Sequence, residues 1–259
     1  MLETIKDKML VTVSGGRSSA YMAIRMHQEM QHKFDMDFVY ANTGQEHPKT
    51  IEFIRNISKH FGIHIHLIEA DVKEAGVGSG FKEVTYATLS ENGEPFEDVI
   101  AKYGLPTVGF MHCTRELKIS PMNAYMKKYD IKKRCLGIRF DEPNRYKPKE
   151  DVYYPLVTNW KVTKEDIGRW WAEQEFDLEI PDYLGNCTWC YKKSDRKLNI
   201  LAKEHKEVFD FPLRMETKYA DDSRQIFRGY RTTKEVLDGV TYDLFDDVCA
   251  DECGSVIDF

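Results

Sequence analysis

The chain has 259 residues, enough to bury a full hydrophobic core as one large domain or as one domain with an appendage. Its 42% hydrophobic and 31% charged residues are typical of a soluble globular protein, and the net charge of −6 excludes an overall bias toward nucleic acid. The charged N-terminus and the short apolar stretches exclude a signal peptide and a membrane-spanning helix, so we expect a cytoplasmic protein with no membrane partner.

The first predicted strand, residues 9–13, ends in Ser14-Gly15-Gly16-Arg17-Ser18-Ser19, and an amphipathic helix follows to about Met30. The glycines permit positive φ and close approach of a ligand to the backbone. The first amides of a helix lack internal partners, the helix dipole adds partial positive charge, and the serines supply hydroxyl donors and an N-cap. The segment therefore predicts either an anion-binding loop or an ordinary β–α turn in which Gly and Ser serve capping alone.

Residues 37–41 predict a second strand, which ends in Asn42-Thr43-Gly44. Pro48 suits the first position of a helix that runs to Gly62, and residues 63–68 predict a third strand. Strands that alternate with helices predict an α/β fold with a mostly parallel sheet. Ligands of such sheets bind at the carboxyl ends of the strands, so we expect both polar segments to face one crevice.

The middle of the chain is less regular over residues 71–112, where a short helix is expected over 96–103. Ser120-Pro121 is typical of a helix start, with Ser as N-cap and Pro at the first position, and a fourth strand is expected at 134–138. Residues 102–149 are rich in Lys and Arg, which suits either an anionic ligand or a solvated helix face.

In the second half, Thr163 begins a sequence close to a capping box, and the helix that follows carries Trp170 and Trp171, which we interpret as core or interface residues. Residues 214–234 place several Arg and Lys around aromatic residues, a pattern that fits a lid over a ligand, a contact for nucleic-acid phosphates or a solvated helix. Residues 235–259 are acidic and contain no Lys or Arg.

Six cysteines in a cytoplasmic chain favour metal or redox chemistry over structural disulfides. Cys187 and Cys190 form a C-x-x-C pair within chelating reach, and Cys113 can join them only if the fold brings it close. Three Cys ligands suffice for a 4Fe–4S cluster, while zinc and a redox dithiol are the alternatives. Cys135, inside the fourth predicted strand, is expected to be simply buried.

Several ordered blocks resemble the phosphoadenosine phosphosulfate (PAPS) reductase family of the PP-loop adenine nucleotide alpha hydrolase superfamily. The first loop is similar to the S-G-G-x-D-S loop of the ATP pyrophosphatases, with Ser18 where the pattern has Asp. Thr43-Gly44 with Pro48-Lys49-Thr50 resembles D-T-G…F-P-E-T, with Asn42 in place of Asp. Further similar blocks are C-x-x-x-K-x-x-P over Cys113–Pro121, G-x-R…E/S-x-x-R over Gly137–Arg145, Tyr154-Pro155-Leu156 with the helix after it, and C-x-x-C over Cys187–Cys190.

The resemblance implies a doubly wound nucleotide-binding domain over residues 1–210, with helices on both faces of the sheet, and a C-terminal extension or lid over 211–259. Near the C-terminus, Glu252-Cys253-Gly254 is similar to the segment that carries the nucleophilic Cys of the PAPS reductases, so Cys253 and Arg139 are the implied catalytic residues. The implied metal ligands are Cys113, Cys187 and Cys190. The implied nucleotide-binding residues are Ser14, Gly15, Gly16, Arg17, Ser18, Ser19, Asn42, Thr43, Gly44, Arg115, Lys118, Arg139 and Arg145.

Three functions fit these residues. The first is reduction of an adenylyl sulfate to sulfite by a thiol, with a thioredoxin-like reductant as partner. The second is ATP-dependent sulfur insertion into nucleic acid, assisted by an iron–sulfur cluster. The third is a non-catalytic module that binds a nucleotide or a cluster. A homodimer is compatible with each of them.

Overall fold

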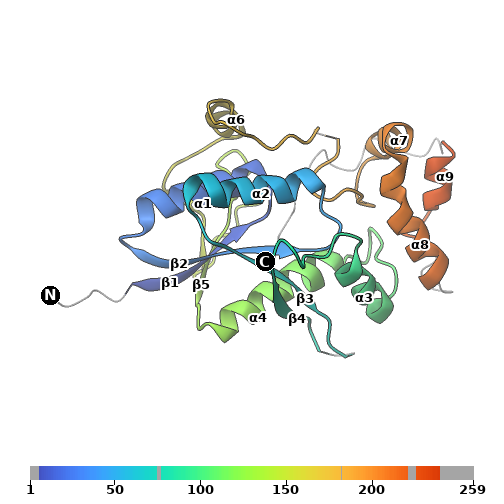
Figure 1. The fold of residues 1–259 in the computed structure, drawn as a ribbon, viewed down its shortest axis with the longest axis horizontal. Helices are drawn as coiled ribbons and strands as arrows, with labels where there is room; N and C mark the ends of the chain where they lie inside the picture. Colours follow the sequence, from blue (N-terminus) through green and yellow to red (C-terminus); the bar gives the residue numbers. More distant parts are fainter. Residues whose placement is uncertain (1–5, 75–76, 182, 221–225, 240–259) are drawn as a thin grey trace.

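The computed structural model describes residues 6–74, 77–181, 183–220 and 226–239. Its centre is a six-stranded sheet in the order β4-β3-β2-β1-β5-β6, parallel except for β4, which runs antiparallel to β3 (Figure 1). The predicted α/β fold with a mostly parallel sheet is therefore confirmed. The strands are β1 (Asp7–Val13), β2 (Phe34–Asn42), β3 (Ile65–Asp71), β4 (Gly80–Val84), β5 (Lys133–Cys135) and β6 (Val152–Tyr153).

The helices cover both faces of this sheet and continue beyond one end of it (Figure 1). They are α1 (Arg17–Met30), α2 (Pro48–Phe61), α3 (Glu94–Tyr103), a π-helical turn (Arg115–Ile119), α4 (Ser120–Lys128), α5 (Pro155–Thr158), α6 (Lys164–Ala172), α7 (Asp195–Glu204), a 3-10 turn (Lys206–Phe209), α8 (Asp210–Tyr219) and α9 (Thr233–Leu237). None of the helices in the described part of the chain combines the length and the apolar character needed to span a membrane.

Alternation along β1 shows how the two faces are filled. Met9, Val11 and Val13 pack under α1, α2 and α6, whereas Leu10 faces α4 on the opposite side. This period of two is what a strand buried on both faces requires. Trp171 of α6 lies in the first of these clusters, which confirms its interpretation as a core residue.

A third cluster joins the C-terminal helices to the edge of the sheet. Side chains of α7, α8 and α9 pack with α3 and with Trp189 and Tyr191, which flank Cys190. This core contains residues from both sides of the boundary that the sequence places at residue 210, and that boundary stays a prediction. The acidic tail from residue 240 onward, with Cys249 and Cys253, lies outside the described residues.

Three local expectations are wrong. The N-cap of α1 is Gly16 and not a serine, and no side chain in the described residues caps that helix. The N-cap of α4 is Ile119, because the helix continues directly from the π-helical turn and Ser120 already lies inside it. The fourth predicted strand is shorter than expected, since only Lys133–Cys135 pair with β1 and residues 136–138 lie beyond its end, with the Leu136 amide still bonded to the Tyr153 carbonyl of β6 at 2.9 Å.

Candidate functional site

The loop between β1 and α1 has the backbone geometry of an anion-binding turn. Gly15 has a φ of 78°, and a Cβ built there would lie 2.3 Å from Thr50 Cγ2, so this position requires glycine. Gly16 is the N-cap, with an extended φ of −94° and no side-chain cap among the described residues. The first amides of α1 therefore keep their hydrogen-bonding capacity, and the helix dipole adds partial positive charge beside them.

Two serine side chains and one glycine hold the shape of this loop. Ser19 Oγ accepts a hydrogen bond from the Ser14 amide at 3.0 Å and donates to the Gly16 carbonyl at 3.0 Å. The Ser14 and Ser19 hydroxyl oxygens are 2.8 Å apart. From the other side, the segment after β5 approaches so closely that a Cβ at Gly137 would lie 2.9 Å from Ser19 Cα. These contacts support the shape of the loop from both sides.

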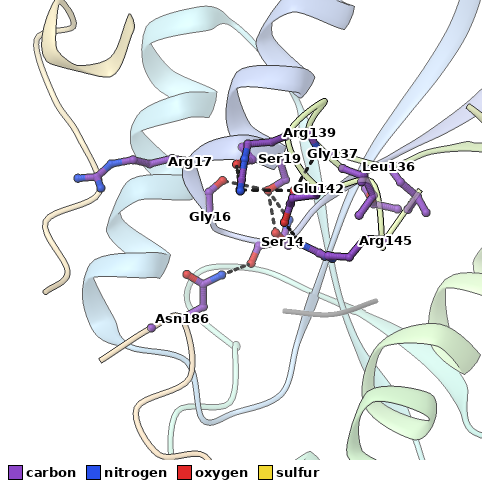
Figure 2. Close-up of a pocket in the computed structure, with 14 residues that line it drawn as sticks. Ser14, Gly16, Arg17, Ser19, Leu136, Gly137, Arg139, Glu142, Arg145 and Asn186 are labelled. Carbon is purple, nitrogen blue, oxygen red and sulfur yellow. Dashed lines mark hydrogen bonds and ion pairs between the residues drawn. The ribbon is translucent and has the colours of Figure 1, made fainter. Parts of the chain in front are cut away.

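A cavity of about 200 Å³ lies between the start of α1 and the segment that follows β5 (Figure 2). Ser14, Gly16, Ser18 and Ser19 of the loop line it together with Arg139 of the later segment. Among the residues predicted from sequence to bind the nucleotide, Ser14, Gly16, Arg17, Ser18, Ser19, Arg139 and Arg145 line this cavity. The cavity sits at the carboxyl ends of β1 and β5, where ligands of parallel sheets bind.

The charges in the cavity centre on Arg139, Glu142 and Arg145. Arg139 Nη1 lies 3.4 Å from Ser18 Oγ, and its Nε donates to Asp141 at 2.9 Å. The Glu142 side chain is only 5% exposed; it accepts from the Arg139 amide at 3.0 Å and forms an ion pair with Arg145. Arg145 Nε is buried and makes no hydrogen bond within the described part of the chain. Two guanidinium groups therefore line the cavity, both paired with buried Glu142, and Arg139 is also held by Asp141.

Two predicted binding residues have the polar ends of their side chains bonded to other parts of the protein. The Arg17 guanidinium points away from the cavity in Figure 2 and forms two 2.7 Å hydrogen bonds with Asp177. The Asn42 amide donates to buried Glu69 at 2.7 Å and to the Ser90 carbonyl at 2.9 Å. In both residues the polar end of the side chain stabilises the protein's own fold.

The segments that contain Thr43, Gly44 and Arg115 also lie outside the cavity lining. Thr43 Oγ1 donates to Glu46 at 3.0 Å. Gly44 has a φ of 76° and passes so close to Gly93 that a Cβ would lie 3.0 Å from the Gly93 Cα. Arg115 is paired with its neighbour Glu116 at 2.8 Å. The sequence assignment of these residues to the nucleotide stays a prediction.

A second polar region surrounds buried Glu46, one strand away from the cavity. Lys118 Nζ lies 3.5 Å from Glu46 Oε1, and the two side chains are 12% and 1% exposed. Cys187 Sγ lies 3.9 Å from the other carboxylate oxygen. Burial acts against the charge of Lys118, yet the Glu46 carboxylate, with the sulfurs of Cys187 and Cys113, raises the Lys118 pKa above its ordinary value. Burial and the Glu46 charge raise the pKa of Cys187 to about 12.

The three predicted metal ligands share this neighbourhood. Cys113 Sγ lies 3.4 Å from the hydroxyl of Tyr191, the residue that follows Cys190 in the chain. Cys113 and Cys187 both raise the pKa of Lys118. Among the residues that the structure describes, however, no three His, Cys, Asp or Glu side chains are arranged to hold a metal ion. As described, these side chains therefore do not form a cluster or zinc site, and Cys187 lies beside Glu46. Cys135 is fully buried in β5, as expected.

Arginines from the C-terminal region hold the residues that follow the C-x-x-C pair. Arg228 Nη1 donates to the carbonyls of Tyr191 and Lys193, each at 2.6 Å, and Nη2 donates to Asp195 at 2.7 Å. Arg231 is also buried and lies 3.6 Å from the same Asp195 carboxylate. The basic pattern over 214–234 therefore includes two arginines that serve the fold and not an exposed surface.

Half of the 14 residues that line the cavity are not among those predicted from sequence, and Glu142 and Asn186 are the two with the most polar side chains. In the sequence, Glu142 stands out only as part of a block that resembles the family. In the structure, its carboxylate pairs with both Arg139 and Arg145. Asn186 lines the cavity, and its Nδ2 donates to the Ser14 carbonyl at 3.0 Å. Periodicity could not have identified Asn186, which lies in an irregular segment; its position directly before Cys187 was the one available signal.

Two solved structures are similar to this one at low sequence identity. The PAPS reductase of Candida auris, in a phosphate complex, is 13% identical with a TM-score of 0.42 over 66% of this chain and 74% of that chain. The U34-tRNA thiolase NcsA of Methanococcus maripaludis, with its 4Fe–4S cluster, is 14% identical with a TM-score of 0.46 over 99% of this chain and 82% of that chain.

Sequence relatives are more informative. The uncharacterized nin region protein ORF290 of Escherichia phage lambda is 38% identical over 202 residues, 75% of this chain and 69% of that protein. An uncharacterized protein of Methanocaldococcus jannaschii is 22% identical over 69% of this chain, which spans about a third of its length (34%). The model of the phosphoadenosine phosphosulfate reductase domain matches residues 8–154. With the β1–α1 loop, the second strand and the Arg139 segment all inside that match, this chain belongs to the phosphoadenosine phosphosulfate reductase domain family.

Proposed function

We propose that this chain binds an adenine nucleotide with its anionic end in the cavity at the start of α1, and that it reduces an adenylyl sulfate to sulfite with thiols. The observation that carries the proposal is the pairing of an uncapped helix N-terminus with the Arg139 guanidinium across one cavity. Amides, serine hydroxyls and a guanidinium are the donors that sulfate and phosphate oxygens require.

In this proposal the first amides of α1 and Arg139 hold the sulfo group and stabilise negative charge as the reaction proceeds. A cysteine thiolate, assigned to Cys253 from the sequence resemblance, attacks the sulfur atom. A sulfur–sulfur bond forms, the bond between sulfur and the bridging oxygen breaks, and the nucleotide leaves as its monophosphate. A dithiol reductant of the thioredoxin type then attacks the cysteine sulfur, releases sulfite and becomes oxidised to its disulfide as the cysteine returns to a thiol.

Replacement of the loop Asp by Ser18 supports sulfonucleotide reduction over ATP cleavage, because an ATP pyrophosphatase needs a carboxylate there for metal and phosphate handling. The test is sulfite release from adenosine 5′-phosphosulfate and from its 3′-phosphorylated form, with reduced thioredoxin as the reductant. Sulfite in the wild type and none in Cys253→Ser, with nucleotide affinity unchanged, is the expected result. Sulfite release that survives Cys253→Ser would remove that cysteine from the proposal.

One observation favours ATP-dependent sulfur insertion as a second candidate. Cys113 and Cys187 both approach Lys118, and the C-x-x-C segment directly follows the cavity residue Asn186. Pyrophosphate release from ATP, together with iron in the anaerobically purified protein, would favour this function. Nucleotide binding without sulfite or pyrophosphate would leave a binding module.

A further inference from the structure

Asn186 contacts the cavity and the cysteine segment at the same time. Its side chain lines the cavity, packs over Gly16, where a Cβ would lie 3.4 Å from Nδ2, and donates to the Ser14 carbonyl at 3.0 Å. Its own carbonyl accepts a 2.7 Å hydrogen bond from the amide of His47, the N-cap residue of α2. The residue therefore links the ends of β1 and β2 with the peptide unit that leads into Cys187.

The next two residues extend that link along the end of β2. Cys187 forms an antiparallel bridge with Glu46, and the Thr188 amide donates to the Gln45 carbonyl at 2.9 Å. The segment 186–188 is thus pinned to residues 45–47 by backbone bonds and to the nucleotide loop by one side chain. Of these contacts, the hydrogen bond from the Asn186 side chain to the Ser14 carbonyl is the one that lies at the cavity, where a ligand would cover it.

Covering that hydrogen bond has a physical consequence. A hydrogen bond that loses its neighbouring water lies in a medium of lower dielectric and becomes harder to break. Local opening of the 186–188 segment would have to break the bond between Asn186 and Ser14, so opening becomes rarer when the cavity is filled.

From this geometry we propose that Asn186 is a positioning residue that couples occupancy of the nucleotide cavity to the order of the Cys187 segment. The inference rests on the proposed function, because it requires a nucleotide in the cavity. It adds that ligand binding holds the Cys187 thiol in one place beside Glu46. The coupling acts through a side chain that touches both regions and not through a change in either set of charges.

Hydrogen–deuterium exchange of the full chain, with and without saturating adenosine 5′-phosphosulfate, tests the coupling. The reporters are the backbone amides of His47 and Thr188, whose hydrogen bonds survive the substitutions. In the wild type we expect the ligand to slow their exchange about tenfold, and in Asn186→Ala, at the concentration that saturates that variant, we expect almost no slowing. Calorimetry establishes the saturating concentration for each variant.

Thr188→Val is the matched control, because Thr188 Oγ1 pins the same segment to the Gln45 carbonyl at 3.0 Å but does not line the cavity. We expect this variant to exchange faster in both states and to keep the tenfold ratio. If both variants lose the ratio of exchange rates without and with ligand equally, Asn186 only holds the segment in place, and the coupling is overturned. It is also overturned by a full ratio in Asn186→Ala, the loss of binding in that variant, or binding to the wild type without slowing.

Calorimetry also separates this inference from the proposed function. If the wild type gives no heat of binding with adenosine 5′-phosphosulfate, its 3′-phosphorylated form or ATP, the proposed function and the coupling both fail. A heat of binding in the wild type without slower hydrogen–deuterium exchange of the reporter amides overturns the coupling alone.

Discussion

The carboxyl edge of the sheet carries two polar regions that handle charge in different ways. In the cavity, the first amides of α1 are uncapped within the described residues, while Arg139 and Arg145 pair with the carboxylates of Asp141 and Glu142. Around Glu46, the buried carboxylate already forms an ion pair with the ammonium group of Lys118 and accepts a hydrogen bond from the hydroxyl of Thr43. The first region has donors available for a ligand, whereas the second is balanced by its own side chains. Proximity of polar groups is therefore not enough to identify a binding site; the balance of donors and acceptors decides.

The largest expected effect comes from breaking the balanced region. Lys118→Met leaves Glu46 buried without its cation, which we expect to lower the free energy of unfolding by about 3 kcal/mol. Adding Glu46→Gln to this variant should recover most of the loss. Urea denaturation of the two single variants and the double variant measures both effects.

An exposed pair supplies the control for that experiment. Lys49 pairs with Glu179 at 2.9 Å on the surface, so Lys49→Met should change the free energy of unfolding by less than about 1 kcal/mol. A Lys118→Met protein as stable as Lys49→Met would show that the Glu46 region is not balanced by that ion pair.

The next effect concerns the cavity. Arg139→Met should weaken binding of adenosine 5′-phosphosulfate about 30-fold, because a guanidinium bond to an anion in a partly buried site contributes about 2 kcal/mol. Calorimetry measures the affinity, and circular dichroism verifies the fold. The matched variant is Arg25→Met, whose guanidinium pairs with Glu29 at 2.6 Å on α1 and should leave affinity unchanged. Equal affinities in both variants would remove Arg139 from the binding set.

A smaller effect with the opposite sign is expected at Glu142. Its carboxylate competes with any anion for Arg139 and Arg145, so Glu142→Gln should tighten binding of the same nucleotide about fivefold. Asp141→Asn is the control, since Asp141 pairs with Arg139 at 2.9 Å from a more exposed position and should matter less. Weaker binding in Glu142→Gln would mean that the carboxylate serves chiefly to position the two arginines.

The smallest effect lies far from both regions, at the capping box of α6. Thr163→Ala removes the side chain that caps the helix and should lower Tm by about 2 °C without altering nucleotide affinity. Hydrogen bonds from the Thr163 side chain and amide lower the Asp166 pKa to about 2. Because that folded value lies below the unfolded one, near 4, the stabilisation is present above pH about 4 and is lost as pH falls toward 2. Tm measured across this range should therefore fall less steeply in Thr163→Ala.

The sequence predicted the β1–loop–α1 unit and α2 closely, because apolar periodicity, the two glycines and Pro48 all act within one or two turns of chain. The end of β5 could not be predicted in the same way. Residues 136–138 look like strand, but Gly137 must approach the Ser19 backbone, which draws them away from β1. That constraint joins segments more than a hundred residues apart.

The site shows the same limit at the level of single side chains. Arg17 looked like a ligand for an anion because it lies in the loop, yet its partner Asp177 is 160 residues away. Likewise, the ion pair between Lys118 and Glu46 and the hydrogen bond from Asn42 to Glu69 join residues that only the folded sheet brings together. Residue type and local spacing therefore located the loop, while the tertiary partners decided which side chains remain available within it.

The contacts of Arg228 have a consequence for how this protein is made. The carbonyls after Cys190 are held by a side chain that leaves the ribosome 38 residues later than Cys190 itself, well after the whole sheet has been synthesised. Because chains emerge from the N-terminus and form local contacts as they do so, the loop between β1 and α1 can form before Arg228 reaches the residues after Cys190. During that interval residues 191–195 lack the hydrogen bonds that Arg228 gives them in the folded protein. The arrangement of the chain just after Cys190 is therefore completed late in synthesis, when Arg228 is available.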